Sequence, residues 1–270
     1  MKKNHRGHDL SAQELYLKNH RKHHHSVTFL RFLFLFLFLC LWEICVDLAI
    51  IDSFFFSSPS RVASCFFSMV MDHSIFRHIG ITLLETIASF LLVILFGLLC
   101  ATLLWYSKSL SEIMEPYLVV LNSLPKSALA PLFIVWLGTG MNTIIVAGVS
   151  VAVFGCIISL YTGFHLVDEE KITLIYTLGG TKKDVFFKVV LPSSIPTILS
   201  TMKVNIGLAL VGVIIGEFLA ARYGLGYLII YGSQVFQLHL VITSVIILCL
   251  IAMGLYQLIQ YAEHYYKKMI

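Results

Sequence analysis

Few residues of this chain combine a reactive side chain with a spacing that would let them act together. Four histidines near the N-terminus, His20, His23, His24 and His25, could be presented to a metal ion by a helix, but a solvated basic tail is the preferred interpretation. The sequence contains no GxxxxGK[ST] phosphate-binding motif, no HExxH zinc motif and no GxSxG nucleophile motif. The six cysteines are scattered, mostly in apolar runs, and form neither a disulfide framework nor a CxxC pair. We therefore predict that the chain is not an enzyme and binds no metal.

The composition is that of a membrane protein. Hydrophobic residues make up 58% of the 270 residues, charged residues only 13%, and the mean hydropathy is +0.87, whereas a soluble domain is about a quarter charged. The apolar runs are roughly 20 residues long and do not alternate, which favours helices over barrel strands. We predict an all-α integral membrane protein with about six transmembrane helices and no nucleic-acid partner. The expected spans are residues 29–51, 81–106, 117–137, 142–164, 197–220 and 240–262, preceded by a basic tail over 1–28.

The longest polar interruption between these spans covers residues 168–196 and is patterned as two short helices. Asp168 can cap a first helix, and Gly179-Gly180 can end it. Thr181 and Asp184 then have the capping-box spacing for a second helix. The second helix has an apolar face of Val185, Phe186, Val189 and Val190, with lysines at 182, 183 and 188. Two short helices hinged at a glycine pair on a membrane surface predict a docking element for a soluble partner.

Polar residues within the spans are candidates for a solute path. In the third span Pro125 and Pro131 break or kink the helix, and backbone freed by proline is tolerated where it faces protein or a watery cavity. The alternative is a kink needed only for packing. The candidate path residues are Asn122, Ser123, Pro125, Lys126, Asn205 and Glu217. Ser107–Glu115 is expected to be a polar turn before this span.

Other polar and small residues in the spans are assigned structural roles. Glu43 and Asp47 share one face of the first span and are expected to anchor it to another helix, with a place in the solute path as the alternative. Glu85 is expected to snorkel to the nearer interface. Gly212 and Gly216 in the fifth span form a GxxxG face that allows close helix approach.

The distribution of basic residues predicts the orientation. Seven precede or begin the first span, four lie in the 168–196 segment and two at the C-terminus, whereas the segments on the other side hold only Arg61, Arg77 and Arg222. Because basic residues concentrate on the cytoplasmic side, both termini and the 168–196 segment are expected in the cytoplasm.

Several motifs resemble those of a known family. Leu178-Gly179-Gly180-Thr181, followed by Leu191-Pro192, resembles the EAA loop of ATP-binding-cassette (ABC) importer permeases. The sequences Leu121–Pro131, Trp136–Gly140, Gly216–Ala220 and Gly224–Leu228 resemble the sulfonate/taurine/nitrate branch, and the likeness extends over about residues 80–235. One departure is clear, because the family's Glu-Ala-Ala triplet falls on Thr173-Leu174-Ile175 and its glutamate is missing.

The resemblance implies a type I, MetI-like permease fold and a place in a larger machine. The expected partners are a second permease copy as a homodimer, a cytoplasmic ABC ATPase dimer that binds ATP and Mg²⁺, an extracytoplasmic solute-binding protein and membrane lipid. The residues expected to couple to the ATPase are Thr173, Leu178, Gly179, Gly180, Thr181, Lys182, Asp184, Leu191 and Pro192. This chain itself would hold no cofactor and would lie in a bacterial cytoplasmic membrane.

The resemblance leaves the solute open. A sulfonate, taurine or nitrate is expected, or a pyrimidine vitamin precursor, which close relatives carry. The alternatives are the permease of another importer branch, for osmolytes or amino acids, and an ion-driven secondary transporter. The secondary transporter would need an inverted repeat that is not visible in the sequence.

Overall fold

The computed structural model describes residues 12–269, which contain helices and no strand, and it divides into two compact units at Ala63 and Ser64. The first unit contains α1 (Ala12–Asp47), α2 (Ser53–Phe56) and the start of α3 (Pro59–Met71). The predicted tail over 1–28 lies partly outside the described residues, as do the side chains of the four histidines. Within this unit Glu43 accepts hydrogen bonds from the Ser60 backbone N–H at 3.0 Å and the Ser60 hydroxyl at 2.6 Å. Glu43 therefore ties α1 to the first turn of α3, as expected of an anchoring residue.

The second unit is built around three long helices, α4 (Ser74–Tyr106), α7 (Met141–His165) and α11 (Ile195–Ala220). Small residues let them approach closely: a Cβ added at Gly212 would lie 2.8 Å from the Gly148 Cα, and one at Gly216 would lie 2.9 Å from the Ile144 Cα. The predicted GxxxG face is thus the contact surface between α11 and α7. Gly148 in turn faces Ser89 of α4, with 2.8 Å from an added Cβ to the Ser89 Cβ.

The third predicted span is two helices rather than one. α5 (Lys108–Ser123) and α6 (Lys126–Leu137) meet at an angle of 94°. Leu124 and Pro125 separate them, because Pro125 has no N–H to continue the ladder and holds its preceding residue extended. The prediction of a turn over Ser107–Glu115 is wrong, since Ser107 accepts from the Leu110 N–H as the N-cap of α5.

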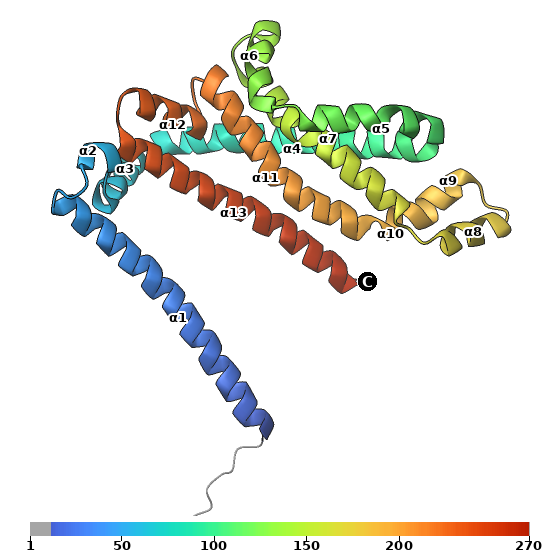
Figure 1. The fold of residues 1–270 in the computed structure, drawn as a ribbon, viewed down its shortest axis with the longest axis horizontal. Coiled ribbons are helices and arrows are strands. Elements are labelled where there is room, and N and C mark those ends of the chain that lie inside the picture. The colour runs from blue at the N-terminus through green and yellow to red at the C-terminus, as the bar shows by residue number, and fades with distance from the viewer. Residues whose placement is uncertain (1–11, 270) are drawn as a thin grey trace, which may run out of the picture. The chain divides into compact units, whose positions relative to one another are not determined.

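The remaining helices complete the unit. α8 (Glu169–Thr177), α9 (Lys182–Val185), the π-helix η1 (Phe186–Val190) and α10 (Leu191–Ser193) join α7 to α11. After α11, α12 (Leu225–Gln234) and α13 (Leu238–Met269) end the chain, with α12 and the N-terminal end of α4 at the end opposite α8 and α9 (Figure 1). Five helices are long and apolar enough to cross a membrane, and the bent α5–α6 pair makes up to six among the described residues.

Candidate functional site

The first helix of the 168–196 segment is closed at both ends by local hydrogen bonds. The Asp168 side chain accepts from the Glu170 N–H at 3.0 Å and caps the N-terminus of α8. At the C-terminus the Gly180 N–H donates to the Ile175 carbonyl at 2.9 Å and the Gly179 N–H to the Tyr176 carbonyl at 3.0 Å. These two bonds form a Schellman motif, which requires a left-handed residue, and Gly179 has φ of +80°. The predicted stop at the glycine pair is therefore confirmed.

The second helix begins with a complete capping box. The Asp184 N–H donates to the Thr181 hydroxyl at 3.3 Å, and the Thr181 N–H donates to the Asp184 carboxylate at 2.9 Å. Lys188 forms an ion pair with the same carboxylate at 2.8 Å. Only Leu178, Gly179 and Gly180 separate the end of α8 from Thr181, so the two helices are joined by a short connection whose backbone is fixed on both sides.

We expect this box to be insensitive to pH near neutrality. The Lys188 ammonium, followed by the hydroxyl and N–H of Thr181, holds the pKa of Asp184 well below its ordinary value. Because the folded pKa is the lower one, the stabilisation is complete above the ordinary pKa and is lost only as pH falls toward the folded value. Asp184→Asn should remove the stabilisation of the capping box at neutral pH. Amide hydrogen exchange over residues 181–190 should then be faster than in wild type. Equal exchange in Asp184→Asn and wild type would contradict the role of the box.

One side of the segment is fixed to the rest of the unit. Val185, Phe186 and Val190 are buried in a cluster with Val93 of α4 and Phe164 of α7. The Phe186 ring lies against three aromatic rings from α4 and α7, with centroids 5.1 Å from Trp105, 5.5 Å from Tyr106 and 5.6 Å from Phe164. Lys182 adds a hydrogen bond from its ammonium to the Tyr106 carbonyl at 2.9 Å. Movement of η1 must therefore be passed to the ends of α4 and α7.

The other side of the segment is open and partly apolar. Leu174 is 58% exposed and Leu178 75% exposed, and Tyr176 beside them is also exposed. Thr173, Gly179 and Thr181 are exposed as well, and Pro192 follows on the exposed part of α10. Leu191 is half-buried and packs against the cluster around Phe186. The residues predicted to couple to an ATPase thus divide into an exposed set and a set that holds the segment in place.

The solute-path candidates in the third span have local partners. The Lys126 ammonium donates to the carbonyls of Leu121, at 2.7 Å, and Asn122, at 2.5 Å. These carbonyls end α5, so Lys126 satisfies groups that the break at Pro125 frees. Ser123 donates its hydroxyl to the Val119 carbonyl at 2.9 Å. The kink prolines were visible in the sequence, whereas the capping use of Lys126 was not.

Lys126→Met tests this capping role. Leaving two carbonyls without their charged donor should lower the free energy of unfolding by about 1–3 kcal/mol, measured as a lower thermal midpoint in detergent. The apparent KM of transport should stay unchanged, since the ammonium is already engaged by backbone. A changed KM with unchanged stability would instead place Lys126 in the solute path.

The candidate Asn205 and the neighbouring Lys203 lie inside α11. The Asn205 amide donates to the Thr201 carbonyl at 2.8 Å, one turn before it in the same helix, and the Asn205 side-chain oxygen is buried. Lys203 of the same helix forms an ion pair with Glu263 of α13. These contacts do not bring either residue together with the candidates of the third span.

Glu217 and Glu85 form a buried acidic pair at the far end of the unit from α8. Glu217 accepts from the Thr82 hydroxyl at 2.6 Å and from the Gly226 N–H at 2.5 Å, and Thr82 accepts from the Leu225 N–H at 2.8 Å. Glu85 of α4 is in hydrogen-bonding contact with Glu217 and is only 2% exposed. The expectation that Glu85 snorkels is therefore wrong, because Glu85 is buried against Glu217 of α11 and does not reach an interface. Glu217 lies far along the chain.

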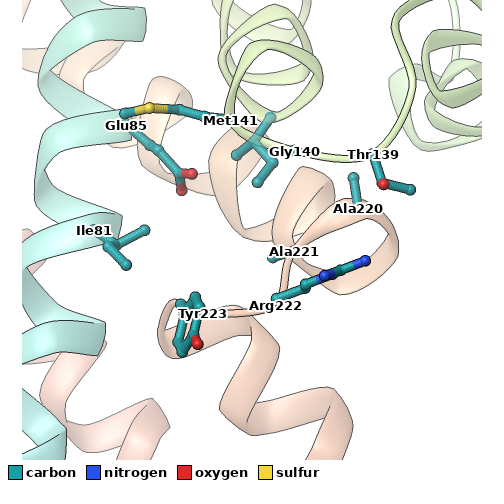
Figure 2. A pocket seen from close by; sticks show the side chains of 10 residues that line it. Ile81, Glu85, Thr139, Gly140, Met141, Ala220, Ala221, Arg222 and Tyr223 are labelled. Atoms are coloured by element: carbon teal, nitrogen blue, oxygen red, sulfur yellow. The ribbon is translucent and has the colours of Figure 1, made fainter.

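A cavity of about 350 Å³ lies beside this pair. Figure 2 shows Glu85 pointing into it from α4, with Arg222 and Tyr223 on the opposite side. Its walls are completed by Ile81, Thr139, Gly140, Met141, Ile144, Ala220 and Ala221. Glu217 does not line the cavity; it holds the loop after α11 instead.

Comparisons with known proteins agree with this architecture. The profile of the family described as "Binding-protein-dependent transport system inner membrane component" matches residues 93–262. An ABC transporter permease protein of Haemophilus influenzae is 30% identical, covering 84% of this chain and 91% of the relative. The formylaminopyrimidine transport permease protein ThiX of Halalkalibacterium halodurans is 28% identical, over 72% of this chain and 77% of the relative. The aliphatic sulfonates transport permease protein SsuC of Bacillus subtilis is 25% identical, covering 79% of this chain and 77% of the relative.

A solved structure shares the fold. A chain of the MetNI methionine ABC transporter in an inward-facing conformation superimposes with a TM-score of 0.62 at 20% identity, covering 74% of this chain and 97% of that chain. The predicted MetI-like fold and the resemblance to ABC importer permeases, including the sulfonate branch, are confirmed. The chain therefore belongs to the family of binding-protein-dependent transport inner membrane components, the permeases of ABC importers, and is a multi-pass protein of the cytoplasmic membrane.

Proposed function

We propose that this chain is the permease subunit of an ATP-driven importer and that the 168–196 segment couples it to an ATPase. The assembly contains a second copy of the chain, a cytoplasmic ATPase dimer that binds ATP and Mg²⁺, and an extracytoplasmic solute-binding protein. Both termini and the 168–196 segment lie in the cytoplasm, in accord with the basic residues at 171, 182, 183 and 188.

The observation that carries the coupling role is the two-sided construction of the segment. On its exposed side, Leu174 lies in α8 and Leu178 is the C-cap of that helix. Because α8 is capped at both ends and α9 begins with a capping box, the two leucines form part of a rigid apolar surface for a partner. Its buried side holds Phe186 against rings of α4 and α7. A force applied to α8 and α9 therefore reaches two helices of the membrane bundle directly.

The solute is a small polar nutrient. Relatives with named solutes carry a formylaminopyrimidine and aliphatic sulfonates, which supports either an organic anion or a nitrogen heterocycle. The binding protein performs most of the selection in such an assembly, so few solute contacts are required from this chain.

Reconstitution tests this function. The chain would be purified with candidate ATPase and binding-protein partners, placed in proteoliposomes, and assayed for ATP hydrolysis while sulfonates, pyrimidines, osmolytes and amino acids are added in turn. Hydrolysis that rises with the loaded binding protein, accompanied by solute accumulation, is the expected result. Accumulation driven by an ion gradient without ATP would instead identify a secondary transporter.

A further inference from the structure

Two arginines at the end of the second unit opposite α8 carry charge that no carboxylate neutralises (Figure 1). Arg77 lies in the first turn of α4 and Arg222 in the loop after α11, and both are exposed. Among the residues that the structure describes, neither guanidinium forms an ion pair. The segments at this end, residues 64–80, 138–141 and 221–239, contain one carboxylate, that of Asp72. This end of the unit therefore has an excess of positive charge.

Tyr223 connects the two arginines. The Arg77 guanidinium carbon lies 3.7 Å from the centre of the Tyr223 ring, and Arg222 directly precedes Tyr223 in the chain. A guanidinium stacked on a ring keeps the N–H groups at its edge free to donate to a planar carboxylate. Arg222 and Tyr223 also line the cavity of about 350 Å³, so the surface beside them is concave (Figure 2). Arginine and tyrosine together at a hollow are typical of the strongest contacts in protein interfaces.

The loop over residues 222–226 is held in place by side chains of two long helices. Its successive N–H groups at positions 224, 225 and 226 donate to His78, Thr82 and Glu217 at 3.0, 2.8 and 2.5 Å. His78 and Thr82 belong to α4, and Glu217 belongs to α11. The loop is therefore preorganised, which lowers the conformational entropy lost when a partner binds.

A lipid surface is the other anionic partner for arginines beside a bilayer. Lipid headgroups are mobile, and a long arginine side chain reaches them by snorkelling from any backbone near the interface. Here the Tyr223 ring immobilises one guanidinium, and three hydrogen bonds fix the loop that carries the other. This rigid arrangement favours a partner whose carboxylates are also fixed, which is a folded protein.

We propose that Arg77 and Arg222 form a docking contact for an acidic patch on the extracytoplasmic solute-binding protein. Each guanidinium donates to a carboxylate of that protein, and the loop over 222–226 transmits the contact to α4 and α11 together. This inference rests on the proposed function, which supplies the binding protein and places this end of the unit on the extracytoplasmic side. It adds the residues and the charge of the contact.

A binding measurement tests the contact. The probe is the binding protein whose solute-loaded form stimulates ATP hydrolysis in the reconstituted assembly. Its affinity for the full chain with its ATPase in nanodiscs would be measured by biolayer interferometry. Arg77→Gln and Arg222→Gln should each weaken binding at least roughly tenfold, because a charge-assisted hydrogen bond loses its donor. Wild-type affinity should also fall between about 50 and about 500 mM salt, and the variants should depend less on salt.

Gln234→Glu provides the matched control. It changes the formal charge by one unit in the same direction as Arg222→Gln, also at an exposed residue of this end. Gln234 is the last residue of α12, roughly 14 Å along the helix from the loop. This variant should bind like wild type, and Arg222→Gln should keep the wild-type thermal midpoint because it breaks no ion pair. Equal affinity in wild type and both arginine variants, or an equal loss in Gln234→Glu, would overturn the contact.

This contact and the proposed function fail in different ways. If no candidate binding protein stimulates hydrolysis with wild type, the importer assignment fails and the contact fails with it. If wild type is stimulated and both arginine variants bind as tightly as wild type, only the contact fails. If those variants also retain less phosphatidylglycerol than wild type after detergent extraction, the arginines bind lipid headgroups instead.

Discussion

Gly212→Val should prevent α7 and α11 from packing and cause the largest loss of stability of any substitution considered. A Cβ at this position would lie 2.8 Å from the Gly148 Cα and 2.9 Å from the Ala147 carbonyl oxygen, and backbone atoms cannot turn aside as a flexible side chain can. The helices must separate, which forfeits close packing along their length. We expect a cost of about 3 kcal/mol or more, seen as a lower thermal midpoint and loss of the monodisperse peak in detergent.

Gly207→Val provides the matched control. It makes the same change in the same helix, but a Cβ at Gly207 meets nothing within 4 Å. This variant should behave like wild type within experimental error. If both variants are equally stable, the close approach of α7 and α11 is not what holds the unit together.

Gly179→Glu should have the largest effect on transport while leaving the chain folded. A Cβ at this position meets nothing within 4 Å, so the substitution causes no collision, but φ of +80° is strained for any residue with a side chain. The Schellman bonds that end α8 must rearrange, and the angle between α8 and α9 changes with them. We expect solute uptake to fall at least roughly tenfold while thermal stability falls by only about 1–2 kcal/mol.

Gly138→Glu controls for the strain itself. Gly138 has φ of +78° and open space around an added Cβ, but it lies in the turn between α6 and α7 instead of in the 168–196 segment. Because Gly138 also has ψ of −173°, a combination almost confined to glycine, its loss of stability should be at least as large, while its transport should stay nearly normal. Normal uptake by Gly179→Glu would remove the hinge from the coupling mechanism.

The 168–196 segment could be predicted in detail because its structure is set by local hydrogen bonds. Asp168, the glycine pair and the Thr181–Asp184 box act on neighbours within a few residues, and sequence spacing alone fixes such bonds. The π-helix Phe186–Val190 was not expected. It leads into Pro192, which has no N–H to donate to the preceding turn.

Features that depend on distant partners could not be predicted. The polar composition of 107–115 suggested a turn; the N-cap at Ser107 is a local signal that was missed, whereas the burial of Leu118 against Leu104 and Ile157 depends on α4 and α7. The break at Pro125 was visible, whereas its 94° angle depends on packing against α7. Glu85 looked like an interfacial residue because its partner Glu217 and the loop that Glu217 holds lie far along the chain.

Co-purification with an ATPase is the most direct test of the central claim. The chain would be expressed with its neighbouring genes, extracted in mild detergent as wild type, Leu178→Asp and Val235→Asp, and probed for a bound ATPase. Leu178 and Val235 are both exposed C-cap residues of short helices. Leu178 ends α8, whereas Val235 ends α12 at the opposite end of the unit. We predict that wild type and Val235→Asp retain an ATPase and that Leu178→Asp loses it. Retention by Leu178→Asp, or no ATPase with wild type, would contradict the assignment of this segment as the coupling element.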